Sequence, residues 1–143
     1  MTQEDKQLLL KDLCARLPYM DDLKVARYIE RDDKIREFIP KFTFNLDILN
    51  ICMRNPEFII KPYLRPMSSM TEVEYVEFME YSGFKTEYVA LIKGFFWSIG
   101  SWEESYENFI KVYDWLNAHH FDYRGLIEKG LALEAPKGMY KID

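Results

Sequence analysis

Residues 42–48 read Phe-Thr-Phe-Asn-Leu-Asp-Ile, a stretch in which apolar and polar side chains alternate strictly. An alternation with period two places the apolar side chains on one face of an extended chain, so it predicts a half-buried β-strand. The overlapping segment from Leu46 to Met53 also fits a helix, and the sequence leaves both interpretations open there. The number of strands is therefore three or four.

The other strand candidates lie around this stretch, within a strand region that spans residues 23–63. Residues 23–30 alternate in the same way, residues 35–39 are short and apolar, and a further apolar run begins at Phe58. Short turns separate these candidates. Because parallel strands need long crossover connections, the region predicts a small antiparallel sheet.

Helices are predicted before and after the strand region. Thr2 caps a helix over residues 3–16, which Pro18 ends. A helical region spans residues 71–133 and begins with a capping box formed by Thr71 and Glu74. Its first helix covers residues 71–82 and ends before Gly83, a second follows over residues 84–99, and a third starts after Ser101. A short fourth helix is predicted near Leu126 to Leu133.

The whole chain, residues 1–143, is therefore predicted to form a single domain. Its fold class is α+β, with an N-terminal helix, a small antiparallel sheet of three or four strands, and then three or four helices packed on the sheet.

The charge of the chain is uneven. The net charge of −5 divides into +1 for residues 1–70 and −6 for residues 71–143. An acidic second half argues against duplex DNA and anionic membranes as partners, and it favours a basic protein surface. The sequence shows no signal peptide and no membrane-spanning segment, and its two cysteines, Cys14 and Cys52, are expected to be free thiols. We therefore expect a cytoplasmic protein.

The helix over residues 71–82 carries apolar side chains on two sides. Val73, Val76 and Met79 share one face, whereas Phe78 and Tyr81 lie on another. Either the helix is packed on both sides within the domain, or one side meets a partner, which is a different protein or a second copy of the chain. Tyr81 is accordingly a candidate partner-binding residue.

The only cluster with the side chains of an acid–base or metal site is His119-His120-Phe121-Asp122. Adjacent helical histidines point about 100° apart, so they rarely bind one metal, and no phosphate, nucleotide or nucleophile motif accompanies them. We predict no catalytic residue, no metal site and no cofactor. The alternatives are a small enzyme centred on His120 and Asp122 and a structural role in which the histidines cap a helix end.

The neighbouring residues Asp122, Tyr123 and Arg124 allow two interpretations. Asp122 and Arg124 could form a local ion pair that orders the turn before Gly125. Alternatively, His120, Asp122, Tyr123 and Arg124 form a contact site, because tyrosine and arginine are enriched where proteins bind one another.

Two stretches carry a resemblance to known sequences. They are IKPYLRPMSSMT at residues 60–71 and DWLNAHHFDYRGLIEKGLA at residues 114–132. With the opening LLLKDLCARLPY at residues 8–19, they resemble a group of small uncharacterised proteins encoded by anaerobic gut bacteria and by their phages and mobile elements. The resemblance covers about half of the chain. It implies a genomic context, a cytoplasmic accessory protein carried with mobile DNA, and no particular activity.

The sequence thus predicts a non-catalytic protein-binding module with an acidic, aromatic surface, acting as an inhibitor or a protective protein. A weak single-stranded nucleic-acid binder is a further alternative, because aromatic residues could stack on bases beside a set of basic residues in the first half: Lys24, Arg27, Lys34, Arg36 and Lys41.

Overall fold

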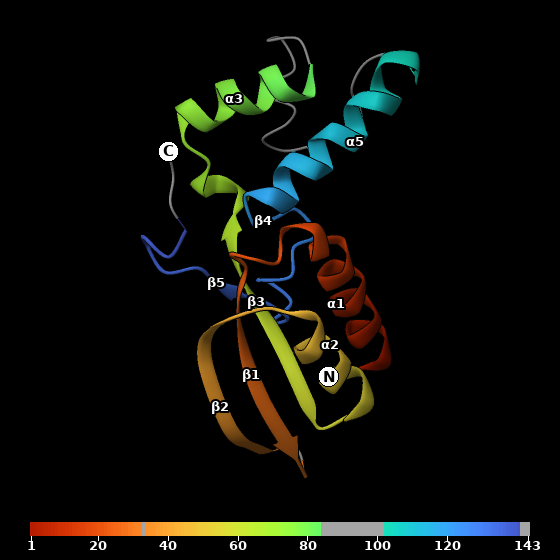
Figure 1. The fold of residues 1–143 in the computed structure, drawn as a ribbon, viewed down its shortest axis with the longest axis vertical. Coiled ribbons are helices and arrows are strands. Elements are labelled where there is room, and N and C mark those ends of the chain that lie inside the picture. Colours follow the sequence, from red (N-terminus) through yellow and green to blue (C-terminus); the bar gives the residue numbers. More distant parts are fainter. Residues whose placement is uncertain (33, 84–101, 141–143) are drawn as a thin grey trace.

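The computed structural model describes residues 1–32, 34–83 and 102–140 of the 143, without the side chains of residues 102–108. The helix expected over residues 84–99 lies outside the described residues. The fold class is α+β, as predicted: a helix comes first, and a mixed sheet is combined with helices along the chain (Figure 1).

The sheet is built around one central hairpin and a third strand. Strand β1 (Lys24–Arg31) pairs antiparallel with β2 (Lys34–Thr43) on one side and with β3 (Phe58–Pro66) on the other. Two short strands, β4 (Phe121–Asp122) and β5 (Leu133–Glu134), pair with β3 in parallel. The predicted antiparallel pairing is therefore present among the first three strands, with β1 in the centre in the order β2-β1-β3. The sheet as a whole is mixed, not purely antiparallel as predicted, because β4 and β5 add parallel pairs to β3.

Helix α1 (Gln3–Ala15) agrees with its predicted range almost to the residue. The Thr2 hydroxyl accepts a hydrogen bond from the Asp5 backbone N–H, and the Asp5 carboxylate accepts one from the Thr2 backbone N–H, so a capping box starts the helix. A 3-10 turn, η1 (Leu17–Tyr19), follows and leads into β1. The local capping signal is therefore enough to fix the beginning of α1.

The structure corrects the prediction for residues 42–48. Strand β2 ends at Thr43, and Leu46 opens helix α2 (Leu46–Arg54), so the helical alternative for this segment is right. Asn45 is the N-cap, with its side chain accepting from the Ile48 N–H at 2.9 Å. Leu46, which the alternation predicts to be buried, is 51% exposed.

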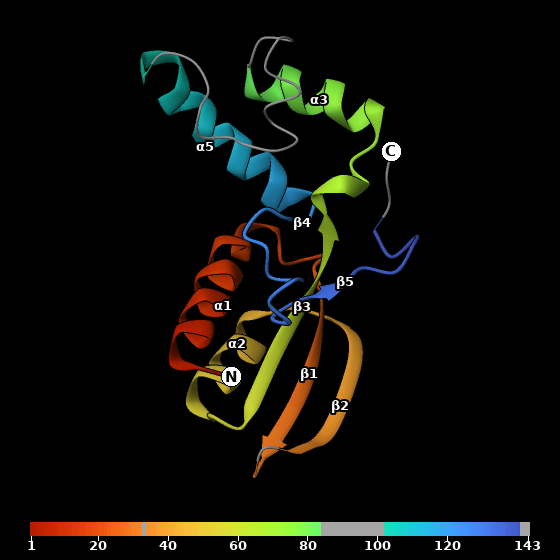
Figure 2. The same ribbon diagram turned by 180° about the vertical axis from the view of Figure 1, so that it is seen from behind.

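The remaining helices lie beyond the end of β3. After a second 3-10 turn, η2 (Met67–Ser69), come α3 (Glu72–Ser82) and α5 (Trp102–Ala118), which pack against each other above one end of the sheet (Figures 1 and 2). Residues 126–130, predicted to be helical, form turns instead, between two glycines with positive φ angles.

Two separate groups of apolar side chains form the interior. One lies between the sheet, α1 and α2, and its members are Leu9, Leu13, Leu23, Val25, Phe44, Leu49, Ile59, Ile60, Leu64, Leu126, Leu131 and Ala132. We call this the sheet core. The other lies between α3 and α5, and its members are Met70, Tyr75, Phe78, Val112, Trp115, Leu116 and Phe121. We call this the helix core.

Candidate functional site

The outer half of α3 carries apolar and acidic side chains together. Val73 is 66% exposed, Val76 58% and Tyr81 50%. Three exposed acidic residues, Glu72, Glu77 and Glu80, lie beside them. No lysine or arginine occurs within the helix. We call this surface of six residues the α3 face. Exposed valines on a helix are favoured neither by helix propensity nor by solubility, so the surface has the composition of a contact site.

A buried ion pair fixes α3 from its inner side. Arg65, near the end of β3, donates two hydrogen bonds of 2.7 Å to the two carboxylate oxygens of Glu74. The two side chains are 8% and 3% exposed. The Arg65 guanidinium also lies 4.2 Å from the ring centroid of Phe121, so it contacts both an anion and an aromatic ring. This arrangement joins the sheet to α3 with a defined geometry.

Glu74 has a second role at the start of the helix. Its carboxylate accepts from the Thr71 backbone N–H at 3.0 Å, and Thr71 accepts in turn from the Glu74 N–H. Burial, the strongest single influence, raises the pKa of Glu74, but the hydrogen bonds from Arg65 and Thr71 together outweigh it and the pKa is lowered. Glu74 is therefore ionised in the folded protein.

Aromatic rings support the inner side of α3. Phe78 packs on Trp115 of α5 with ring centroids 5.0 Å apart, and Trp115 in turn stacks on Phe121 at 5.7 Å. His119 also stacks on Trp115, with ring centroids 3.9 Å apart. The Nδ1 atom of His119 lies 2.8 Å from the Trp115 carbonyl oxygen. His119 thus has the helix-capping role that the structural alternative predicted.

The predicted partner-binding residues do not lie on one surface. Tyr81 is exposed on the α3 face, whereas Tyr123 and Arg124 are half-buried. Tyr123 donates to the Asn117 side-chain oxygen at 2.8 Å. Arg124 lies 3.3 Å from the carboxylate of Asp12 in α1, so the ion pair is not the local one with Asp122 that the sequence suggested.

His120 and Asp122 are buried, at 1% and 8% exposure, and this corrects their prediction as contact residues. Asp122 accepts hydrogen bonds from two backbone N–H groups, those of Leu126 at 2.9 Å and Ile127 at 3.0 Å. It therefore caps the turn that follows, which is a structural role. Its carboxylate is occupied and does not orient His120 as an acid–base pair would require.

His120 lies in a separate environment beyond the end of α5. Its backbone is left-handed, with φ of 62°, and its ring packs on Tyr140 at 4.3 Å between centroids. Nε2 lies 3.0 Å from the carboxylate of Asp22. Burial lowers the pKa of His120, and this effect outweighs the opposing influence of Asp22. The protein has one cavity between α1 and α2 and another beside Tyr28, and His120 lines neither of them.

A second buried charge pair was not predicted. Arg16, fully buried at the end of α1, donates to both carboxylate oxygens of Asp12 and to the Phe121 carbonyl oxygen at 2.8 Å. Asp12 thus sits between Arg16 and Arg124. A spacing of four residues between Asp12 and Arg16 was the available signal, but it is also common on helix surfaces.

The basic residues proposed for nucleic-acid binding are partly engaged within the protein. Arg27 pairs with Glu37 at 2.9 Å, and the Lys24 ammonium donates to the Thr43 hydroxyl at 2.8 Å. Lys34, Arg36 and Lys41 are exposed on β2. Two of the five proposed cations are therefore engaged within the protein, and three are exposed on one edge strand.

Within the part of the chain that the structure describes, no group of three or more His, Cys, Asp or Glu side chains is placed to hold a metal ion. None of the described helices combines the length and the apolar character needed to cross a bilayer.

The comparisons with known proteins add no relative. No protein-family model, no curated protein and no solved structure matches this chain.

Proposed function

We propose that the chain is a non-catalytic protein-binding module that engages a basic partner through the α3 face. The observation that carries the proposal is the exposure of Val73, Val76 and Tyr81 among three glutamates on one side of α3. Apolar groups supply the driving force for such a contact, and the acidic groups select a partner of opposite charge.

The contacts that hold α3 on the rest of the protein support this role. The inner side of the helix is held by the Arg65–Glu74 pair and by the packing of Phe78 on Trp115. A surface held in this way loses little conformational freedom when a partner binds, which favours affinity. A helix that exposes apolar side chains among glutamates fits a groove with an apolar floor and basic rims on the partner.

The biological role that we propose is inhibition or protection. An acidic face would cover the basic surface of a toxin or a nuclease, and a small accessory protein carried with mobile DNA would suit that task. The acidic charge of residues 71–143 supports this direction, since their balance is −6.

Affinity capture from a host lysate, with two variants of the protein, tests the proposal. The first variant carries Val73→Ser, Val76→Ser and Tyr81→Ser on the α3 face. The control is Ile35→Ser, which removes an equally exposed apolar side chain from β2. We expect wild type and control to retain the same basic protein at low salt, and the triple variant to lose it. Retention by all three proteins, or capture that is independent of salt, would reject the α3 face.

A second copy of the chain is the alternative partner. The β1–β2 hairpin lies at the opposite end of the molecule from α3 and exposes both apolar and basic side chains, among them Ile35, Phe38, Lys34 and Arg36 (Figure 2). A head-to-tail contact between this hairpin and the α3 face would bury complementary surfaces. Sedimentation velocity at rising concentration separates the two proposals, because Ile35→Ser abolishes self-association and leaves the capture of a basic protein unchanged.

A further inference from the structure

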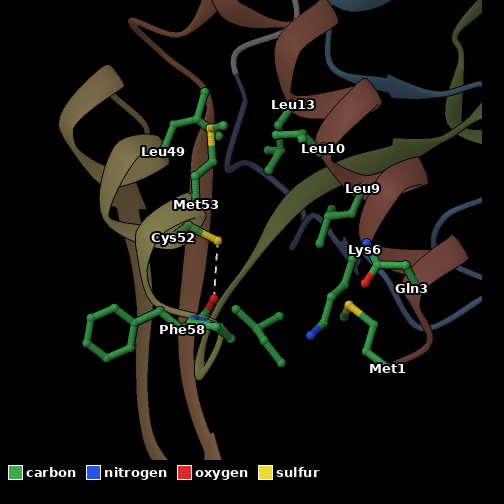
Figure 3. Close-up of a pocket in the computed structure, with 12 residues that line it drawn as sticks. Met1, Gln3, Lys6, Leu9, Leu10, Leu13, Leu49, Cys52, Met53 and Phe58 are labelled. Carbon is green, nitrogen blue, oxygen red and sulfur yellow. Dashed lines mark hydrogen bonds between the residues drawn. The ribbon is translucent and has the colours of Figure 1, made fainter.

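A cavity of about 370 Å³ lies between α1 and α2, at the opposite side of the molecule from the α3 face (Figure 3). Its walls are mainly aliphatic. Leu9, Leu10 and Leu13 face it from α1, Leu49 and Met53 face it from α2, and Ile59 lies at its base. A cavity of this volume with apolar walls is within the range of sites that bind small molecules.

One cationic side chain stands at the cavity. Lys6 is the only lysine or arginine among the described lining residues, and no aspartate or glutamate belongs to them. Figure 3 shows Lys6 extending from α1 with its ammonium group directed into the space between the helices. None of the ion pairs formed among the described residues involves Lys6. Its charge is therefore available to a ligand.

The wall opposite Lys6 contains a thiol. Cys52 donates a hydrogen bond to the Phe58 carbonyl oxygen at 3.2 Å, which orients its sulfur toward the cavity side of α2. Burial raises the pKa of Cys52, with a smaller opposing influence from the charge of Lys6. The thiol is therefore neutral at physiological pH and contributes to the apolar lining of the cavity. Its rate of chemical modification measures how accessible the cavity is.

We infer that this cavity binds a medium-chain aliphatic carboxylate, with its chain between α1 and α2 and its carboxylate on Lys6. A single lysine matches a single negative charge, whereas a phosphate would require more donors than the lining residues supply. An amine would be repelled by Lys6. The inference concerns a different surface from the α3 face, so it does not depend on the proposed function.

The two cysteines provide a test within one molecule. Cys52 lines the cavity, whereas Cys14 is exposed and lies outside its lining. Neutral iodoacetamide is added to the full chain with and without octanoate, and the alkylation of each cysteine is followed by mass spectrometry of peptides. We expect octanoate to slow the alkylation of Cys52 several-fold and to leave Cys14 unchanged. Equal protection of both cysteines, or of neither, would overturn the inference.

Two lysine variants and one amine define the role of charge. Lys6→Gln removes the ammonium group at the cavity, and Lys11→Gln removes one from an exposed position on the same helix that does not line the cavity. We expect Lys6→Gln to weaken protection by octanoate about fivefold, and Lys11→Gln to leave it unchanged. Octylamine is expected to protect poorly. If octylamine protects Cys52 as well as octanoate does, the cavity does not select a carboxylate and the inference fails.

Discussion

At the scale of single residues, the main feature is that buried charged side chains form ion pairs with one another. Arg65 depends on Glu74, and Arg16 on Asp12, because a charge removed from water is costly unless a counter-charge and hydrogen bonds compensate it. Removing one member therefore leaves the other uncompensated. The effect should be much larger than for the exposed pair of Arg31 and Glu57.

Glu74→Ala tests this difference. The substitution leaves the Arg65 guanidinium buried without its partner and removes the capping of α3, so we expect the free energy of unfolding to fall by about 3 kcal/mol. Urea denaturation measures the change. The matched control is Glu57→Ala, which should shift the midpoint far less because Arg31 remains solvated. If both variants lower the free energy of unfolding by similar amounts, the buried pair stabilises the protein no more than the exposed pair does.

His120 predicts how stability responds to pH. Its pKa in the folded protein lies below the ordinary value of 6.5, so protonation favours the unfolded chain. The contribution of the neutral ring is complete above about pH 6.5 and is lost as the pH falls through the lower folded pKa. The groups around the ring are Asp22, which raises the pKa, Arg16 and His119, which lower it, and Tyr140.

The corresponding measurement is the melting temperature between about pH 7.5 and about pH 5.5. We expect His120→Asn to flatten the pH dependence seen in wild type, since asparagine tolerates the left-handed backbone at this position and does not titrate. His119→Asn is the control and should keep the wild-type slope. If the slope disappears with His119→Asn and persists with His120→Asn, the pH dependence does not come from His120.

At the scale of helices and strands, the start of α2 shows where the sequence is ambiguous. Asn45 has extended backbone angles, as an N-cap residue does, so it continues the strand geometry for one more residue. The alternation of residues 42–48 therefore runs across the boundary between β2 and α2. The hydrogen bond from the Ile48 N–H to the Asn45 side chain marks the start of the helix, but asparagine also occurs in turns, so the residue alone does not decide between the two interpretations.

Asn45→Ala should destabilise the protein by about 1 kcal/mol, because the first turn of α2 loses its side-chain acceptor. Asn45→Asp retains an acceptor and should stay close to wild type. Both are measured as midpoints of urea denaturation. If the alanine variant is as stable as the aspartate variant, the cap does not determine the start of α2.

The elements that the sequence predicted well are those with local signals. The capping boxes at Thr2 and Thr71 lie within four consecutive residues, so they can be recognised without the fold. The burial of Glu74 could not be recognised, because it depends on Arg65 across a turn. The same limit applies to Asp12, whose second partner, Arg124, lies at the other end of the chain. Tyr81 alone among the predicted contact residues lies on the candidate surface.

At the scale of the whole molecule, the buried apolar side chains of the described residues form two separate groups, the sheet core and the helix core. Arg65 and Phe121 lie where the two meet, at the end of β3 and beside it. Separate groups of buried side chains often open as separate cooperative units. We therefore expect the α3–α5 pair to open more readily than the sheet.

Hydrogen exchange of Phe78→Ala tests this expectation. Phe78 is fully buried in the helix core, and its truncation should destabilise that core by about 3 kcal/mol. Exchange in α3 should then accelerate strongly while β1 and β3 remain protected. Leu64→Ala in the sheet core is the comparison and should accelerate exchange in the strands. Uniform acceleration in both variants would show that the molecule opens as one unit.

The outermost strand, β2, has a consequence for how this protein behaves in a crowded solution. Nearly all of its residues are exposed, and among the described residues it pairs only with β1. Such a strand is a template on which other copies could grow into fibrils. Pro40 supplies no N–H, and Lys41 takes a left-handed φ of 55°, so any growing ladder is interrupted after Ile39. Pro40 and Lys41 therefore limit the pairing of this edge strand with strands of other copies.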